Sequence, residues 1–201
     1  MITREEYRYE CFIEIQNVFK NIDFYTLNTD LRVRTKHIAK FMHLYELYEE
    51  NEQSPLTISS KLTCKALSPS TLEKQKVSLA LKIFNKENSA GLRYLAKAKN
   101  KPEYLDTALF IEKISDWFDV LNVKTPDKGK NLNDPRLNPI DKFQCPSVTF
   151  LKEFVHWMQM QSPLRGKFLT GQTYKACLIT TCGVLGLVKH LLNNNHKGIM
   201  T

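Results

Sequence analysis

Residues 102–122, PEYLDTALFIEKISDWFDVLN, carry the clearest helix pattern in the chain and decide its fold class. Proline is favoured in the first turn of a helix, so Pro102 marks the start. Apolar side chains then recur at helical spacing on or near one face. They are Leu105, Ala108, Leu109, Ile114, Trp117, Phe118 and Leu121. We expect a long amphipathic helix that ends before Thr125 and buries this face in a core.

Similar apolar spacing predicts helices on both sides of this stretch. They cover about residues 4–20, 30–50, 70–84, 88–98, 146–158 and 170–191. Ser70 and Glu73 have the spacing of a capping box, and Thr170 caps the last helix. Residues 53–68 are predicted to be a loop with short turns, and residues 125–145 a flexible segment. Because only 7 glycines and 8 prolines interrupt the chain, the sequence predicts an all-α, irregular domain of six or seven helices.

Composition indicates a globular protein with a basic surface. The 201 residues are enough to bury a core, and 29 Lys and Arg against 21 acids give a net charge of +8. This excess favours a polyanionic partner, either nucleic acid or the phosphates of a nucleotide. The alternative is a basic surface without a partner, because the lysines are spread along the whole chain.

The cysteines, histidines and apolar runs exclude several classes of protein. The five cysteines include no C-x-x-C pair, and the histidines lack metal-ligand spacing, so we expect neither a zinc site nor a disulfide framework. Reduced thiols fit the cytosol or the nucleus. The charged N-terminus is not a signal peptide. The most apolar run, residues 176–188, is shorter than the ~20 residues that span a bilayer, so a buried helix and no membrane partner are expected.

A candidate base-binding site lies at the end of the helix over residues 102–122. Guanine presents its N1–H and its 2-amino group side by side, and one carboxylate can accept both, whereas adenine offers no such pair. Asp119 could be that carboxylate, and Asn122 shares its helix face and could donate to guanine O6 or N7. Phe118 could form an apolar lid over the base. The alternative is that Asp119 and Asn122 form a solvated last turn and Phe118 belongs to the core.

Candidate phosphate ligands lie upstream. Lys76 is in the first turns of the helix that Ser70 opens, where free backbone N–H groups attract anions, and Lys61 lies before it. An ordinary basic face is the alternative. No P-loop motif occurs. The stretch from Asn85 to Asn88 is similar to the guanine-reading Asn-Lys-x-Asp of GTPases, but Asn88 replaces the acid and the stretch falls at a helix junction, so we interpret it as a chance match.

Several of these pieces together resemble a known family. They are Lys61-Leu62-Thr63, Lys76-Val77-x-Leu-Ala with Phe84 seven residues after Val77, Asp116-Trp117-Phe118-Asp119-x-x-Asn122, and the helix that starts at Phe168-Leu169-Thr170. Their order and spacing resemble the GTP-binding insertion domain of P-element-type DNA transposases, including their THAP-domain relatives. The resemblance covers about residues 30–195. It divides the chain into an N-terminal helical flank at 1–28, the insertion domain at 29–195 and a C-terminal tail at 196–201.

The resemblance implies roles residue by residue. Asp119 and Asn122 would read the base, and Phe118 would line it. Val77 would pack near the base or the sugar. Lys61 and Lys76 would meet phosphates or the sugar. Asn85 stands where the family can use a serine, which puts that one contact in doubt.

In this family GTP is a cofactor that helps assemble the transposase on transposon-end DNA, and it need not be hydrolysed. The catalytic acids lie outside the insertion domain, so the resemblance implies a truncated or domesticated domain that is not an enzyme. We therefore expect GTP with Mg²⁺ carried by the nucleotide, and a nuclear location, with the cytoplasm as the alternative. Further partners would be transposon-end DNA and a second copy of the chain or a full-length transposase.

Two other classes of function stay open. One is a helical nucleic-acid-binding module, and the other is a protein-interaction module that docks through the aromatic residues Phe12, Tyr45 and Trp157. Neither would bind a nucleotide.

Overall fold

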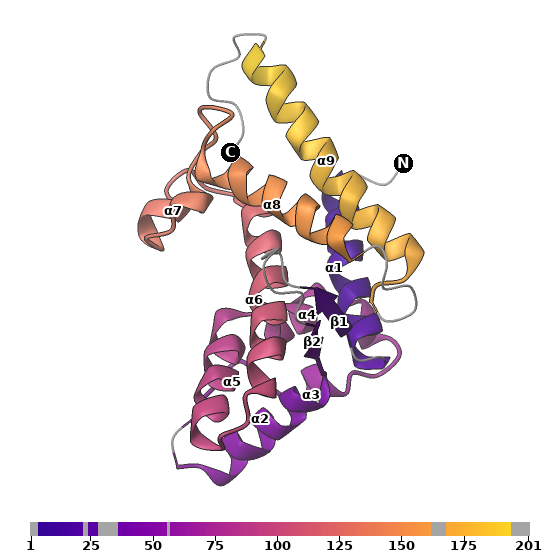
Figure 1. Cartoon of the computed structure of the whole chain (residues 1–201), viewed down its shortest axis with the longest axis vertical. Coiled ribbons are helices and arrows are strands. Elements are labelled where there is room, and N and C mark those ends of the chain that lie inside the picture. Colours follow the sequence, from indigo (N-terminus) through magenta and orange to yellow (C-terminus); the bar gives the residue numbers. More distant parts are fainter. Residues whose placement is uncertain (1–3, 22–23, 28–35, 56, 162–167, 194–201) are drawn as a thin grey trace.

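The computed structural model describes residues 4–21, 24–27, 36–55, 57–161 and 168–193. Within these residues the chain is all-α, with nine α-helices, two 3-10 helices and one pair of short strands (Figure 1). In chain order the elements are α1 (Arg4–Asn21), β1 (Phe24–Leu27), β2 (Lys36–Ala39), α2 (Met42–Gln53), α3 (Cys64–Leu67), η1 (Glu73–Gln75), α4 (Val77–Ile83), α5 (Lys86–Ala98), α6 (Glu103–Leu121), α7 (Lys128–Asn131), η2 (Pro135–Leu137), α8 (Pro146–Met160) and α9 (Gly171–Asn193).

Helix α6 is the centre of the fold (Figure 1). It packs along α5, and its other neighbours include α1, α8 and strand β2. The prediction of this helix from Pro102 onward is confirmed, but its buried face was predicted wrongly in part. Leu105 and Leu109 are 37% and 47% exposed, whereas Tyr104, Phe110 and Ile111 are buried. Neighbours on more than one side explain this, because they cover a wider arc of the helix than one apolar stripe.

The strands correct the predicted helix over residues 30–50. Residues 30–35 lie outside the described part, but Lys36–Ala39 is strand β2, antiparallel to β1 with Phe24 opposite Ala39. Two α6 side chains hold this strand. The backbone N–H of Ile38 donates to Asp106 at 3.0 Å, and that of Lys40 donates to Thr107 Oγ1 at 2.9 Å. Tertiary hydrogen bonds therefore outweigh the helical spacing of the sequence, and α2 starts only at Met42.

The helix predicted over residues 70–84 is also shorter than expected. Ser70 does contact Glu73, with its hydroxyl 3.0 Å from the carboxylate, but this pair closes a 3-10 turn and α4 begins at Val77. The next helix is capped at Asn85 and not at residues 88–89. The Asn85 side-chain oxygen accepts from the N–H of Asn88 at 2.9 Å, which satisfies an otherwise free donor of α5.

One hydrophobic core joins nearly all of the large helices. Helix α1, which the sequence assigned to an N-terminal flank, contributes Phe12, Ile15 and Phe19 to it, each fully buried. The proposed domain boundaries themselves stay a prediction. Phe12 and Trp157 were candidates for exposed docking residues, and this is wrong, because they are 0% and 7% exposed.

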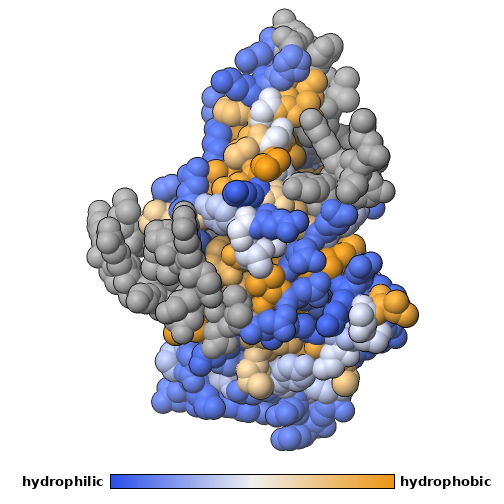
Figure 2. Space-filling model, turned by 90° about the vertical axis from the view of Figure 1, so that its right-hand side faces the viewer, coloured by the Kyte–Doolittle hydropathy of each residue, from blue (hydrophilic) through white to orange (hydrophobic). Residues whose placement is uncertain are grey.

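Two C-terminal segments differ from expectation. Residues 125–145, predicted to be flexible, contain α7 and η2 and pack against α6 and α8. Helix α9 is capped by Thr170, as predicted, but it is buried along one side only, and Ile179 is 64% exposed. Figure 2 shows apolar surface in the upper part of the molecule, where Figure 1 places α9. By length and composition alone, α9 could cross a membrane. An 18-residue stretch of this helix has a mean hydropathy of 1.4, and 17% of that stretch is buried in the structure.

Candidate functional site

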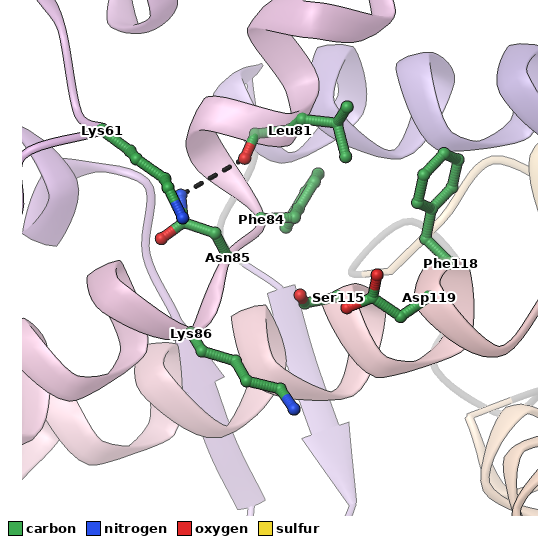
Figure 3. A pocket seen from close by; sticks show the side chains of 8 residues that line it. All are labelled: Lys61, Leu81, Phe84, Asn85, Lys86, Ser115, Phe118 and Asp119. Carbon is green, nitrogen blue, oxygen red and sulfur yellow. Dashed lines mark hydrogen bonds between the residues drawn. The ribbon is translucent and has the colours of Figure 1, made fainter. Parts of the chain in front are cut away.

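A cavity of about 310 Å³ lies between the end of α4, the start of α5 and the C-terminal half of α6. Its lining residues are Lys61, Leu81, Phe84, Asn85, Lys86, Ser115, Phe118 and Asp119 (Figure 3). Four of the seven residues predicted from the sequence are therefore brought together here. The volume is at the lower limit of small-molecule sites, enough for the core of a ligand whose remainder extends into solvent.

Helix α6 builds the acidic end of this cavity. Ser115, Phe118 and Asp119 are spaced i, i+3 and i+4, so they share one helix face. The Asp119 side chain is 38% exposed, and Lys128 Nζ lies 3.2 Å from its Oδ1. Phe118 is 3% exposed and stacks on Phe12 of α1, with ring centroids 4.2 Å apart. This end thus combines an accessible carboxylate with a rigidly supported aromatic ring.

Two lysines also line the cavity (Figure 3). Lys61 precedes α3, and its Nζ lies 2.8 Å from Oε1 of Glu87. The hydrogen bond from Lys61 holds the pKa of the Glu87 carboxyl below its usual value, and the Ser60 hydroxyl donates to the same carboxylate at 2.9 Å. Lys86 is the first residue of α5. The cavity wall therefore combines two lysines with a carboxylate and an aromatic ring.

Asn85 also lines the cavity, but its polar atoms are engaged within the chain. Its amide nitrogen donates to the carbonyl oxygens of Leu81 at 3.3 Å and Lys82 at 3.0 Å, and its oxygen caps α5. These bonds join the end of α4 to the start of α5. The structure thus gives Asn85 a structural role, and its contact to a ligand stays a prediction.

The other three predicted residues do not line the cavity. Asn122 ends α6 and faces α1, where its side-chain oxygen accepts from Arg8 at 3.1 Å and from the Tyr9 hydroxyl at 3.2 Å. Lys76 is exposed, with its Nζ 3.4 Å from Glu73. Val77 is partly buried against the core. Their roles toward a ligand stay predictions.

Sequence reasoning missed the remaining lining residues, Leu81, Phe84, Lys86 and Ser115. Ser115 could have been found, because it lies four residues before Asp119 and so shares its helix face. Lys86 lies in the stretch interpreted as a chance match to a GTPase motif. It joins the site because Asn85 caps α5 and places residue 86 at the edge of the cavity.

A compact ionic cluster adjoins Lys86. The Arg136 guanidinium binds the Asp116 carboxylate with two bonds of 2.7 and 3.1 Å, and it binds Asp134 with bonds of 2.8 and 3.0 Å. Hydrogen bonds from Arg136 lower the pKa of Asp134 to about 2, and the two carboxylates raise the pKa of Arg136. This cluster fixes the segment around η2 against α6.

Metal-binding and disulfide chemistry were not predicted. In the described part of the chain no three His, Cys, Asp or Glu side chains are grouped as metal ligands. The cysteines there are free thiols.

Comparison with known proteins gives two matches. A family model for the TNP-like, GTP-binding insertion domain matches residues 15–135. Among solved structures, the fold is similar to a chain of the Drosophila P element transposase strand transfer complex, with a TM-score of 0.72 and 21% sequence identity over 93% of this chain. The present chain spans 40% of the length of that chain. No curated protein matches. Because the family match covers more than half of its residues, the chain belongs to the TNP-like, GTP-binding insertion domain family.

Proposed function

We propose that this protein binds GTP in the cavity between α4, α5 and α6. The observation that carries the proposal is the chemistry of the cavity wall, which combines the Asp119 carboxylate with two lysines (Figure 3). A guanine nucleotide has the matching groups, since its base carries N–H donors and its phosphates are negative. The family description supports GTP as the ligand.

In this proposal Asp119 selects guanine. Its carboxylate accepts hydrogen bonds from the guanine N1–H and 2-amino groups, whereas the unprotonated N1 of adenine would face the carboxylate with a lone pair. Phe118 lies one residue before Asp119 on the cavity wall and provides an apolar contact for the base. The backbone around both is held rigidly, because Phe118 stacks on Phe12 in the core.

The remaining properties of the proposal follow the transposase relatives. GTP acts as a bound cofactor and not as a substrate, and Mg²⁺ is carried by its phosphates. The protein works in the nucleus and contacts transposon-end DNA, a role supported by the similar fold of a chain in a transposase strand transfer complex. Its protein partners would be a second copy or a full-length transposase. By itself the chain neither hydrolyses GTP nor cleaves DNA.

Isothermal titration with GTP, ATP and xanthosine triphosphate tests the assignment. We expect GTP to bind with Mg²⁺ and ATP to bind much more weakly. Asp119→Asn should weaken GTP binding by about 10- to 100-fold, because hydrogen bonds to a charged group contribute about 1.5–3 kcal/mol. The same change should improve xanthosine triphosphate binding, because the carboxamide can donate to the 2-oxo group of xanthine.

Asp127→Asn is the matched control, because this carboxylate is 68% exposed on the neighbouring turn and does not line the cavity. Equal GTP affinities for the wild type and Asp119→Asn would contradict the assignment. Salt-sensitive DNA binding without any nucleotide preference would instead support a nucleic-acid-binding module.

Two activity assays test the proposed lack of catalysis. GTP incubated with the purified chain should release phosphate at the background rate, and turnover that disappears in Asp119→Asn would contradict this. A labelled transposon-end duplex with GTP and Mg²⁺ or Mn²⁺ should stay intact. Metal-dependent nicking that one Asp or Glu substitution abolishes would show that the chain has an active site.

A further inference from the structure

Lys86 is the cation of the cavity with the weakest attachment to the protein. Its Nζ lies 3.7 Å from Asp116 Oδ1 and 3.5 Å from Asp134 Oδ2, and its side chain is 57% exposed. Charge-assisted N–H···O bonds are about 2.7–2.9 Å long, so the ion pair with Asp116 and the hydrogen bond to Asp134 are both longer than strong charge-assisted bonds. A lysine side chain is flexible, and an exposed one can change rotamer at small cost. Lys86 can therefore turn toward an anion in the cavity that it lines.

Arg136 is the reason that these two carboxylates attract Lys86 only weakly. It makes four hydrogen bonds of 2.7 to 3.1 Å to them, and their side chains are only 11% and 12% exposed. The planar guanidinium matches both carboxylates, and it is not displaced readily by an ammonium group.

We propose that Lys86 binds the phosphates of the nucleotide, and that Arg136 is a positioning residue which keeps Lys86 available by occupying Asp116 and Asp134. This inference rests on the proposed function, because it assigns the phosphate end of the same cavity. The phosphate ligands predicted from the sequence were Lys61 and Lys76. Lys76 does not line the cavity, whereas Lys86 does, so Lys86 is added to them as a phosphate ligand. Lys61 lines the same cavity from another side (Figure 3).

The first experiment separates phosphate binding from base binding. Titrations compare GTP and guanosine on the wild type, Lys86→Gln and the matched control Lys97→Gln, which lies about 16 Å further along the same helix. Lys86→Gln should lose about 10-fold in GTP affinity and bind guanosine as the wild type does. Lys97→Gln should behave as the wild type with both ligands.

The outcomes distinguish this inference from the proposed function. If Lys86→Gln binds GTP as tightly as the wild type while Asp119→Asn does not, the inference is wrong and the proposed function stands. The same holds if Lys76→Gln loses GTP affinity and Lys86→Gln does not. If the wild type binds no guanine nucleotide, the proposed function is wrong, and the inference falls with it.

The second experiment tests the role of Arg136 with two substitutions that should change GTP affinity in opposite directions. Without the guanidinium, Lys86 should be drawn to the carboxylates, so Arg136→Gln should weaken GTP binding several-fold and leave guanosine binding unchanged. Asp134→Asn removes one competitor for Lys86 and should strengthen GTP binding about two- to fivefold, since exposed ion pairs contribute about 0.2–1 kcal/mol.

A double variant completes the cycle. In the Lys86→Gln background, neither Arg136→Gln nor Asp134→Asn should change GTP affinity, because both act through Lys86. Circular dichroism and thermal melting identify any variant that fails to fold. If Arg136→Gln does not fold, the gain in Asp134→Asn and its loss in the Lys86→Gln background decide the result. A fall in GTP affinity for a folded Asp134→Asn, or equal effects in both backgrounds, would overturn the positioning role.

Discussion

Lys128 Nζ lies 3.2 Å from Oδ1 of Asp119, so a lysine of α7 holds the carboxylate that faces the cavity. A carboxylate oxygen has two lone-pair directions and can accept from this lysine and from a ligand at once. The contact therefore fixes the Asp119 rotamer without blocking it. It also gives the segment after α6 a function at the site, because that segment brings Lys128 to the carboxylate.

From this contact we predict that Lys128→Met weakens GTP and guanosine binding equally, by about two- to fivefold. The substitution removes a partly exposed ion pair, which contributes about 0.2–1 kcal/mol. In the proposed function this pair orients the carboxylate that binds the base. Lys130→Met is the control, because its side chain is 80% exposed and pairs only loosely, 3.9 Å from Asp127. Isothermal titration measures both. A loss confined to GTP would place Lys128 at the phosphates and contradict its orienting role.

The stack of Phe118 on Phe12 predicts that the cavity depends on α1. Phe12→Ala should lower the free energy of unfolding by about 3–5 kcal/mol, because it removes a fully buried aromatic side chain and leaves a void. Phe12→Leu should cost less and still weaken nucleotide binding, since it removes the ring that supports Phe118. Urea denaturation gives the stabilities. Leu72→Ala, at a side chain that is 88% exposed, should change stability by no more than about 0.5 kcal/mol.

The ion pair between Lys61 and Glu87 predicts a gain of affinity on substitution. A phosphate that binds Lys61 must compete with the Glu87 carboxylate, 2.8 Å from Nζ, and is repelled by its charge. Glu87→Gln should therefore strengthen GTP binding about two- to fivefold and leave guanosine binding unchanged. Glu112→Gln is the control. Glu112 pairs with Arg93, and neither residue lines the cavity, so this substitution should leave GTP affinity unchanged. Unchanged GTP affinity in Glu87→Gln would mean that Lys61 does not meet the phosphates.

The sequence predicts the fold well where local pattern and tertiary packing agree. Helices α6, α8 and α9 were predicted because each combines an apolar stripe with a start signal such as Pro102 or Thr170, and α1 was predicted from its apolar stripe alone. The strand at Lys36–Ala39 was not predictable in this way. The backbone N–H groups of Ile38 and Lys40 donate to the side chains of Asp106 and Thr107, which follow 68 and 67 residues later in the chain. No local pattern records such a contact.

The candidate site was predictable in part for similar reasons. The chemistry of guanine pointed to Asp119 and Phe118, and that of phosphate to Lys61, all of which line the cavity. The resemblance to the transposase family added Asn85, which lines it too. Lys86 was missed because its position depends on how Asn85 joins α4 to α5. The contacts of Asn122 with α1 were equally invisible, since Arg8 lies 114 residues before it in sequence.

The Arg136 cluster predicts how stability depends on pH. Hydrogen bonds from Arg136 hold the pKa of Asp134 at about 2 in the folded protein, below the value of about 3.9 for an unfolded aspartate. The folded state therefore favours the ionised carboxylate, and its contribution to stability is present above about pH 4 and lost as the pH falls toward 2.

Asp134→Asn should lower the free energy of unfolding at pH 7 by about 1–3 kcal/mol. Urea titrations from pH 7 down to 2 should show this difference shrinking below about pH 4. Asp141→Asn, at an exposed position, should match the wild type throughout. A difference between Asp134→Asn and the wild type that stays constant down to pH 2 would mean that the ion pair with Arg136 is not its cause.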